Sequence, residues 1–392
     1  MNKYMIKNNK IKICIPISNR SEYSYLRNIL FEMENRKTDI DYKIVITGSA
    51  AGTKMDLKKN LKEDNFEWDL EIATEDMEKT IAISKIIKEF STFLDKYKPH
   101  FIILLGDRYE CYAEATTAFY KEIPIVHLHG GDITSGLHHD EQARHAITKL
   151  SSLHFPATEG AAQRIIQMRE NPKWVFPFGS TSIDTLNYLD LPDLKTLSLI
   201  VNMELEKGYI LIAQHPVSLE SEDAGAQMKN TLETAAKFNM NTIITSPCIE
   251  KGYEDMKREI DRAVEEHSNF KFFATFPHEV FLSLMKNASV FIGNSSSGII
   301  EAGHFETPVV NIGPREGKEG EFGRERGMNV IDSDNSKEDI QEKMKIAMST
   351  GFKDKIRDMV HPYGKGNASK QIVEKIIKIG QNVPRNTLLS KK

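Results

Sequence analysis

The chain has 392 residues, and its 52 basic and 56 acidic side chains leave a formal net charge of −4. This balance excludes the polycationic surface with which proteins bind duplex nucleic acid or an anionic membrane. Three widely spaced cysteines (Cys14, Cys111 and Cys248) exclude a disulfide framework and indicate a reducing compartment. No stretch approaches the roughly 18 apolar residues of a membrane span, so we expect a cytoplasmic protein.

Short apolar runs alternate with helical patterns through the first half of the chain. The first run, Ile11–Ile17, follows several lysines, but it contains Lys12 and Pro16 and predicts a β-strand rather than a signal peptide. Further strands are predicted at Tyr42–Thr47, Leu70–Ala73, Phe101–Leu105, Ile123–His129, His154–Ala157 and Val175–Phe178. Helices are predicted at Glu22–Glu34, Glu75–Lys96, Glu110–Tyr120, Asp140–Leu150 and Glu159–Met168. Such alternation predicts a parallel sheet with helices on both faces.

The alternation restarts after a polar stretch that follows Leu191. Strands are predicted at Tyr209–Gln214, Thr242–Thr245, Phe270–Phe276, Val290–Gly293, Pro308–Ile312 and Asn329–Ile331, and a last helix at Ser369–Ile379. We therefore expect two Rossmann-like, doubly wound α/β domains at residues 1–187 and 188–380, followed by a frayed tail at 381–392. Ligands of such domains bind beyond the carboxyl ends of the strands, in the cleft between the domains.

Charged residues follow two strands of the first domain. Arg20 lies in a turn that opens a helix, where its charge opposes the helix dipole, so either a bound phosphate compensates it or it is a solvated loop arginine. Gly106, Asp107 and Arg108 follow the run at 101–105. Asp107 is placed at the edge of the cleft, although a helix cap is the alternative role at that position.

Histidines mark the end of the strand predicted at 123–129. The period of a strand places His127 and His129 on one face. They are either zinc ligands of a metal-dependent hydrolase or histidines that only make hydrogen bonds. No other cluster of Cys, His or Asp residues in the sequence completes a four-ligand site, so we expect no bound metal. Asp140 and Glu141 open the next helix, four residues before Arg144 and His145. These are either surface pairs or a carboxylate of the cleft that Arg144 orients.

The second domain carries the strongest local signal. The strand Val290–Gly293 runs into Asn294 and then into Ser295, Ser296 and Ser297, which open a helix. Backbone N–H groups, hydroxyls and the helix dipole together favour a diphosphate there, with Glu301 directed at a ribose diol. His215 ends an earlier strand as a candidate acid or phosphate ligand, and Arg315 and Arg324 lie in a glycine-rich segment suited to closing over an anion.

In this combination and order the motifs resemble the hydrolysing UDP-N-acetylglucosamine 2-epimerases. The matching segments are Asn19–Ser24, Gly106–Arg108, His127–Asp132, Asp140–Glu141 with Arg144–Lys149, Gln214–Pro216, Gly293–Gly298 and Thr307–Gly313 with Arg315. The resemblance implies the glycosyltransferase-B architecture and no metal or redox cofactor. It also implies a UDP-sugar substrate and a homodimer or homotetramer.

The implied reaction has two stages. UDP leaves C1 while the C2 proton is lost, and water then adds to the resulting 2-acetamidoglucal to give N-acetylmannosamine, a precursor of sialic-type acids. By resemblance the catalytic candidates are Asp107, His129, Asp140, Glu141 and His215. The implied substrate-binding residues are Arg20, Ser24, Arg108, Arg144, Phe276, Phe281, Ser295, Ser296, Glu301, Arg315 and Arg324, of which the two phenylalanines frame the uracil.

Several departures from the family pattern bear on the sugar. Asp132 stands where glutamate is usual, Cys248 where asparagine is frequent, and His138–His139 is an additional pair. The nearest alternative substrate is UDP-N,N′-diacetylbacillosamine, which the legionaminic-acid branch uses. A non-hydrolysing 2-epimerase is disfavoured, because that branch reads His-x-Glu-Ala-Gly where this chain has His127-Leu-His129-Gly-Gly.

Overall fold

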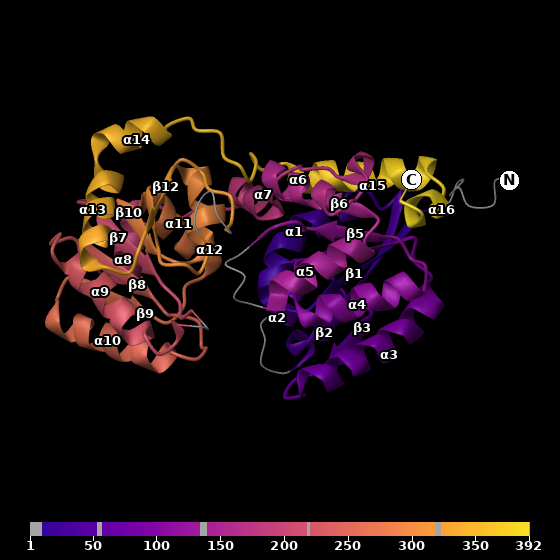
Figure 1. The fold of residues 1–392 in the computed structure, drawn as a ribbon, viewed down its shortest axis with the longest axis horizontal. Helices are drawn as coiled ribbons and strands as arrows, with labels where there is room; N and C mark the ends of the chain where they lie inside the picture. Colours follow the sequence, from indigo (N-terminus) through magenta and orange to yellow (C-terminus); the bar gives the residue numbers. More distant parts are fainter. Residues whose placement is uncertain (1–9, 53–56, 134–138, 218–219, 318–322, 392) are drawn as a thin grey trace. The chain divides into compact units, whose positions relative to one another are not determined.

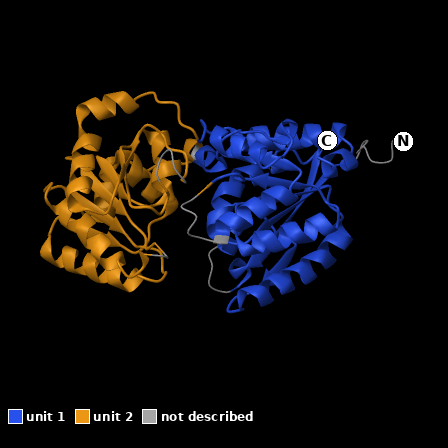
Figure 2. Cartoon of the chain, in the orientation of Figure 1, with its two compact units in different colours: residues 1–132, 139–185, 363–392 blue, residues 133–138, 186–362 orange. Residues whose placement is uncertain are grey.

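The computed structural model describes residues 10–52, 57–133, 139–217, 220–317 and 323–391. It divides into two compact units (Figure 2). Unit 1 comprises residues 1–132, 139–185 and 363–392, and unit 2 comprises residues 133–138 and 186–362. No helix in the described ranges is both long and apolar enough to cross a membrane.

Unit 1 contains a parallel sheet with strand order β3-β2-β1-β4-β5-β6 (Figure 1). Its strands are β1 (Ile11–Ile17), β2 (Ile40–Gly48), β3 (Leu70–Ala73), β4 (Phe101–Leu105), β5 (Ile125–Leu128) and β6 (Leu153–Phe155). Its helices are α1 (Arg20–Glu34), α2 (Leu57–Glu63), α3 (Lys79–Tyr97), α4 (Tyr109–Tyr120), α5 (His139–Leu150), α6 (Glu159–Gln167), α15 (Ala368–Asn382) and α16 (Arg385–Leu389), with short 3₁₀ turns at Ser49–Ala51 and Pro172–Trp174. Helix α7 (Thr181–Tyr188) spans the boundary with unit 2.

Both faces of this sheet are buried. One apolar cluster joins β1 and β2 to α1 and α15, and another joins the opposite face to α3 and α4. Because both faces are covered, the strands carry continuous apolar runs instead of alternating ones.

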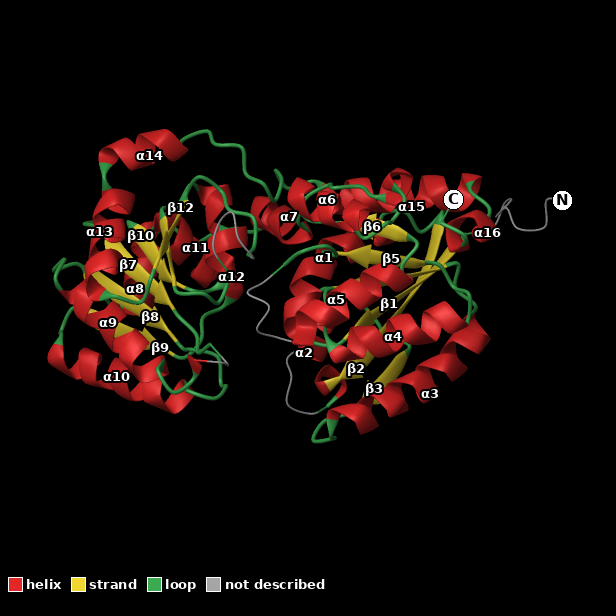
Figure 3. Cartoon of the chain, in the orientation of Figure 1, coloured by secondary structure: helices red, strands yellow, loops and turns green. Residues whose placement is uncertain are grey.

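Unit 2 repeats the same plan, with strand order β12-β11-β10-β7-β8-β9. Its strands are β7 (Tyr209–Ala213), β8 (Asn241–Thr245), β9 (Phe270–Phe273), β10 (Val290–Gly293), β11 (Val309–Ile312) and β12 (Val330–Ser333). Its helices are α8 (Leu194–Val201), α9 (Ala224–Ala236), α10 (Tyr253–Glu266), α11 (His278–Asn287), α12 (Ser296–Ile300), α13 (Lys337–Met348) and α14 (Thr350–Ile356), with a 3₁₀ turn at Ala302–Phe305. Figure 3 shows helices covering the strands in each unit. The two Rossmann-like, doubly wound folds predicted from the sequence are confirmed.

The strand order places a topological switch point in each unit. In unit 1 it lies between β1 and β4, whose connections leave toward opposite edges of the sheet. In unit 2 it lies between β7 and β10, where Ala213 pairs with Gly293. Ligands of open α/β sheets bind beyond the carboxyl ends of the strands at such points. The residues directly after β1, β4, β7 and β10 are therefore the ones to inspect.

The C-terminal part of the chain differs from the expected division. Helix α15 belongs to unit 1, not to the domain expected at 188–380, because Ile372, Val373 and Ile376 are buried in the cluster that contains β1 and α1. The tail expected to be frayed at 381–392 instead contains α16, whose Leu388 is 2% exposed. The polar stretch expected to link the domains contains α8, which Asp193 caps through the Thr196 N–H.

Ion pairs fasten the end of the chain to unit 1. The buried Glu170 carboxylate contacts His154, Lys149 and Lys391. Burial disfavours its ionisation, but the bonds from these three partners outweigh burial and lower the pKa of Glu170 to about 2. Asp184 accepts bonds from the N–H groups of Ala368 and Ser369, and so caps the start of α15.

One predicted strand is absent. In place of a strand at Val175–Phe178 the structure has a single bridge between His154 and Val175. The rings of Phe176 and Phe178 pack instead on Phe155, with centroids 5.4 and 5.8 Å from its ring. The apolar run therefore reflects core packing.

Candidate active site

The turn after β1 is organised by its own side chains. Asn19 caps α1 by accepting the Glu22 N–H at 2.9 Å. The Glu22 carboxylate turns back to accept the backbone N–H and the hydroxyl of Ser18, each at 2.6 Å. Burial raises the pKa of Glu22 to about 7, against the opposing effect of the Ser18 bonds. Arg20 is exposed at the first helical position, and the acidic Glu22 shares its helical turn.

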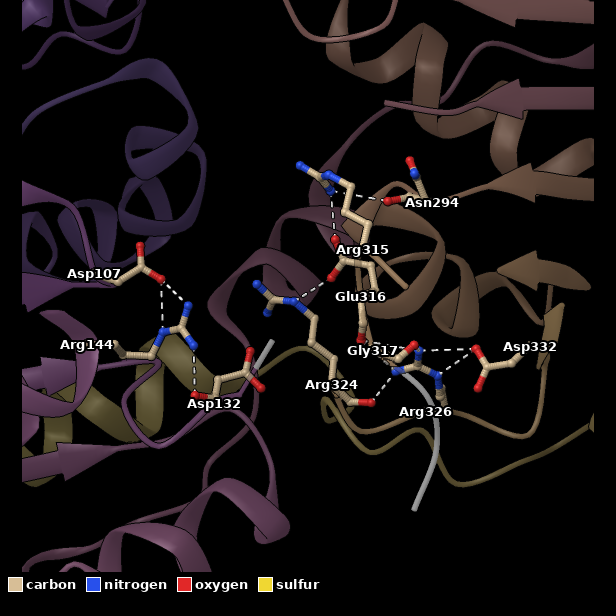
Figure 4. Close-up of polar contacts among 10 residues, drawn as sticks. All are labelled: Asp107, Asp132, Arg144, Asn294, Arg315, Glu316, Gly317, Arg324, Arg326 and Asp332. Atoms are coloured by element: carbon tan, nitrogen blue, oxygen red, sulfur yellow. Dashed lines mark hydrogen bonds and ion pairs between the residues drawn. The ribbon is translucent and has the colours of Figure 1, made fainter. Parts of the chain in front are cut away.

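Asp107, after β4, does not cap a helix. The N-cap of α4 is Arg108, which makes no capping bond through its side chain. The Asp107 carboxylate instead accepts the Arg144 guanidinium, at 2.9 Å from Nε and in a second contact from Nη2 (Figure 4). Arg144 also donates to the Asp132 carbonyl at 2.7 Å. The Arg144 side chain is 4% exposed and that of Asp107 is 25% exposed, so a buried cation orients an accessible carboxylate.

The partner of Arg144 was only partly anticipated by the sequence. The i,i+4 spacing offered Asp140, yet the described contacts of the guanidinium are with Asp107 and the Asp132 backbone. Asp140 and Glu141 lie in the first turn of α5, exposed and half-buried respectively. Of the additional histidine pair, His138 lies outside the described residues.

Arg108 and Ser24, both expected at the substrate, have partners within unit 1. The Arg108 guanidinium donates two bonds of 3.1 Å to Glu110, whose side chain is 0% exposed, while its own is 42% exposed. The Ser24 hydroxyl donates to the Ser21 carbonyl at 2.6 Å, within the first turns of α1. Glu110 was missed because it lies inside the α4 pattern and gives no separate signal.

The two histidines after β5 have different environments. His127 is fully buried, with Nε2 2.8 Å from the Gly106 carbonyl and Nδ1 3.2 Å from the Thr148 hydroxyl, and burial lowers its pKa to about 3. Strand β5 ends at Leu128, and His129 has a left-handed φ of 58°. The strand period that would place both rings on one face therefore does not reach His129.

His129 is held by residues that sequence reasoning missed. Its Nε2 lies 3.3 Å from the Ser180 hydroxyl, and its ring meets Tyr25 edge-on at 5.1 Å between centroids. Ser180 is 51 positions away in the chain, so no local pattern reveals the pair. Within the described ranges, no three His, Cys, Asp or Glu side chains are grouped to hold a metal ion.

At the switch point of unit 2, β7 and β10 are locked together through one asparagine. The Asn294 side chain accepts the His215 N–H at 2.7 Å and donates to the His215 carbonyl at 2.9 Å. His215 Nδ1 accepts the Cys248 N–H at 3.1 Å, which leaves the ring proton on Nε2. Burial, reinforced by Arg315, lowers the pKa of His215 to about 3. The ring is therefore neutral at pH 7 and can meet a phosphate only as a neutral N–H donor.

The serines after β10 begin a short helix. Ser295 is the N-cap without a side-chain capping bond, and α12 covers only Ser296–Ile300. The hydroxyls and backbone N–H groups, more than a long helix dipole, are what this turn offers an anion. Glu301 ends α12 with 9% of its surface exposed. Burial raises the pKa of Glu301 to about 7, although a bond from Ser297 opposes the shift.

The glycine-rich segment brings both expected arginines onto one carboxylate, Glu316 (Figure 4). Arg315 Nη1 also donates to the Asn294 carbonyl at 3.2 Å, which joins the segment to the switch point. The two phenylalanines expected to frame the uracil follow β9, which is an edge strand of the unit 2 sheet. Phe276 is half-buried after β9, 4.7 Å from the Phe273 ring, and Phe281 is half-buried on α11.

Known proteins are similar to this chain over most of its length. A family model described as UDP-N-acetylglucosamine 2-epimerase matches residues 32–377. A Campylobacter jejuni protein named GDP/UDP-N,N′-diacetylbacillosamine 2-epimerase (hydrolyzing) is 34% identical over 83% of this chain and 85% of its own. A Legionella pneumophila protein named UDP-N,N′-diacetylbacillosamine 2-epimerase (hydrolyzing) is 31% identical over 92% of this chain and 94% of its own.

Solved structures share the fold. The crystal structure of UDP-GlcNAc 2-epimerase from Neisseria meningitidis bound to UDP-GlcNAc has a TM-score of 0.79 to this chain at 21% identity. The match covers 94% of this chain and 100% of that one. It confirms the glycosyltransferase-B architecture expected from the sequence.

Proposed function

The chain belongs to the UDP-N-acetylglucosamine 2-epimerase family, and we propose that it is a hydrolysing 2-epimerase in the synthesis of a sialic-type acid. The observation that carries this proposal is the Asp107 carboxylate, accessible at the switch point of unit 1 and oriented there by buried Arg144. A carboxylate in this position is suited to proton transfer, because its geometry is fixed before substrate binds.

The reaction has two balanced stages. In the first, the C1–O bond breaks with its electron pair going to UDP, and a protein base takes the C2 proton, which leaves 2-acetamidoglucal. In the second, water adds its hydroxyl to C1 while a proton returns to C2 on the opposite face. No carbonyl acidifies the C2 proton, so C1–O cleavage leads, and stabilisation of the departing diphosphate is the main electrostatic demand.

Unit 1 supplies the acid and base groups in this proposal. Asp107, His129, Asp140 and Glu141 are the candidates for taking and returning protons. Support comes from the fixed partners of the first two, Arg144 for Asp107 and Ser180 for His129. Arg20, Ser24 and Arg108, after β1 and β4, complete the binding residues of this unit, with Arg144 as the orienting cation.

Unit 2 binds UDP in this proposal. Ser295, Ser296, Arg315 and Arg324 bind the diphosphate, and neutral His215 donates to it from Nε2. Glu301 accepts the ribose hydroxyls, and Phe276 and Phe281 enclose the uracil. The proposal retains a homodimeric or homotetrameric assembly in the cytoplasm, and light scattering coupled to gel filtration measures the assembly.

We propose UDP-N-acetylglucosamine as the substrate, with N-acetylmannosamine and UDP as products. UDP-N,N′-diacetylbacillosamine is the second candidate, favoured by the names of the relatives at 34% and 31% identity. Both sugars carry the 2-acetamido group and the C2 proton that the mechanism requires, so the catalytic residues serve either one.

Proton NMR in deuterated buffer with each nucleotide sugar tests the proposal. Free N-acetylmannosamine carrying deuterium at C2, together with UDP, is the expected result. Turnover of only the bacillosamine nucleotide would keep the mechanism and change the substrate. A product still attached to UDP would contradict the hydrolysing reaction.

A further inference from the structure

The glycine-rich segment of unit 2 contains a buried carboxylate that contacts two arginines at once. Glu316 is 3% exposed. Its Oε1 accepts Arg315 Nη1 at 2.7 Å and its Oε2 accepts Arg324 Nε at 2.7 Å, so each oxygen serves one guanidinium (Figure 4). The two arginines lie nine positions apart in the chain, and Glu316 is the group that joins them.

A third arginine fixes the backbone behind this carboxylate. The Arg326 side chain is 1% exposed and pairs with Asp332 at 3.1 Å. It donates to the Glu316 carbonyl at 3.3 Å, to the Gly317 carbonyl at 2.6 Å and to the Arg324 carbonyl. The buried Arg326 therefore holds the backbone at Glu316, Gly317 and Arg324. The backbone from which the Glu316 side chain extends is fixed in this way.

The resulting cluster retains the means to bind an anion. Both guanidinium groups remain partly accessible, since the Arg315 and Arg324 side chains are 23% and 18% exposed. Arg315 also reaches the Asn294 carbonyl, directly before Ser295 and Ser296. Holding two long side chains in one geometry costs rotamer entropy. Here the bonds to Glu316 already order both arginine side chains before any ligand binds, so less entropy is lost on binding.

We propose that Glu316 is a positioning residue that holds Arg315 and Arg324 together as a two-arginine clamp for the β-phosphate of UDP. This inference rests on the proposed function, since it deepens the account of UDP binding in unit 2. The charge on the β-phosphate grows as the C1–O bond breaks, so donors already in place stabilise the departing group more than donors that must reorganise.

The substitution Glu316→Gln tests the role, because it keeps the shape of the side chain but offers an acceptor to only one arginine. Two opposite effects then compete. Loss of the negative charge strengthens the local positive potential, whereas loss of the second acceptor releases one guanidinium. If Glu316 only dampens the charge of the arginines, Glu316→Gln binds the β-phosphate more tightly. If it positions them, the variant binds the β-phosphate less tightly.

Isothermal titration with UDP and UMP measures the contribution of the β-phosphate directly. We expect the wild-type protein to prefer UDP over UMP by more than about 10-fold, the equivalent of one good charged hydrogen bond. We expect Glu316→Gln to reduce that ratio about 5-fold while leaving UMP affinity near wild type. A general disturbance of unit 2 would weaken both nucleotides equally. Glu265→Gln, which removes an exposed carboxylate on α10 of the same unit, is the control, and its ratio should be unchanged.

A double-mutant cycle keeps the inference testable if Glu316→Gln does not fold. Arg315→Lys and Arg324→Lys should each lower the ratio of UDP affinity to UMP affinity. Because the two arginines act together, the fold-loss of this ratio in the double variant should be smaller than the product of the two single fold-losses. Fully multiplicative losses, or an unchanged or raised ratio in Glu316→Gln, would overturn the clamp. Absence of UDP binding in the wild-type protein would contradict the proposed function itself, and this inference with it.

Discussion

Replacing Glu301 by glutamine is expected to stabilise unit 2 at pH 8 while weakening its affinity for UDP. Glu301 ends α12 with 9% of its surface exposed, and burial raises its pKa to about 7 against the opposing bond from Ser297. The charge is thus held in an unfavourable place, which is typical of a group retained for ligand binding. Glutamine has nearly the same volume and still offers a carbonyl to Ser297.

The magnitude follows from the two pKa values. Below about pH 4.5 the carboxyl group is protonated in both the folded and the unfolded chain and contributes nothing. Between 4.5 and about 7 the unfolded chain ionises first, so folding stability falls as the pH rises, and above 7 the loss is complete. At 1.36 kcal/mol per pH unit the full loss is about 3 kcal/mol. Glu301→Gln escapes it, so the difference from wild type should grow from near zero at pH 4.5 to about 3 kcal/mol at pH 8.

Calorimetry across this pH range is the assay of choice. Both tryptophans, Trp68 and Trp174, belong to unit 1, so their fluorescence does not report on unit 2. Glu265→Gln, at an exposed position in the same unit, removes an equal charge and serves as the control. A stabilisation independent of pH, or a variant less stable than wild type at pH 8, would refute the reasoning. In the same samples the Kd for UDP should rise about 10-fold, because a ribose hydroxyl loses a charged acceptor.

Three further substitutions have defined outcomes. Asp107→Asn should abolish turnover, leave UDP binding intact and lower the Tm by several degrees, because its buried arginine partner loses a carboxylate; full activity would contradict the catalytic role. Glu170→Gln should cost about 3 kcal/mol at pH 7 in urea unfolding, and the difference should fade as the pH drops from 4.5 toward 2, where the wild-type carboxylate is protonated. Gly293→Ala would place a Cβ 2.1 Å from the Ala213 carbonyl at a φ of +134°, so it should destabilise unit 2 by at least about 2 kcal/mol. Gly351→Ala, where a Cβ has no neighbour within 4 Å, should not.

The sequence predicted most strands closely, because each is a continuous apolar run bounded by turn residues. The runs at Leu70–Ala73, Phe101–Leu105 and Val290–Gly293 match β3, β4 and β10 residue for residue. Val175–Phe178 failed as a strand prediction because an apolar run also arises where rings fill a core. The sequence did not predict that α15 belongs to unit 1. An amphipathic pattern shows that a helix has a buried face, but it does not show which sheet that face packs against.

The positions of the site residues were easier to predict than their partners. Asp107, His129, His215 and Ser295 each lie within two residues of the end of a strand, and the rule for parallel sheets places such residues at the carboxyl edge of their own sheet. Their partners come from tertiary contacts across 37 positions for Arg144 and 51 for Ser180, which leave no trace in local spacing. The neutral state of His215 likewise depends on burial.

The insertion of residues 186–362 between two parts of unit 1 sets an order of events during translation. The strands of unit 2, β7 to β12, all come from one continuous stretch of the chain. That unit can therefore fold as soon as the stretch has left the ribosome. Unit 1 cannot, because the helix that covers β1 and α1 begins only at Ala368. At about 5–20 residues per second, the nascent unit 1 sheet waits roughly 10–40 s with this apolar face uncovered. Chaperones that protect exposed apolar surface should therefore engage residues 11–155 of the nascent chain and release them only near the end of synthesis.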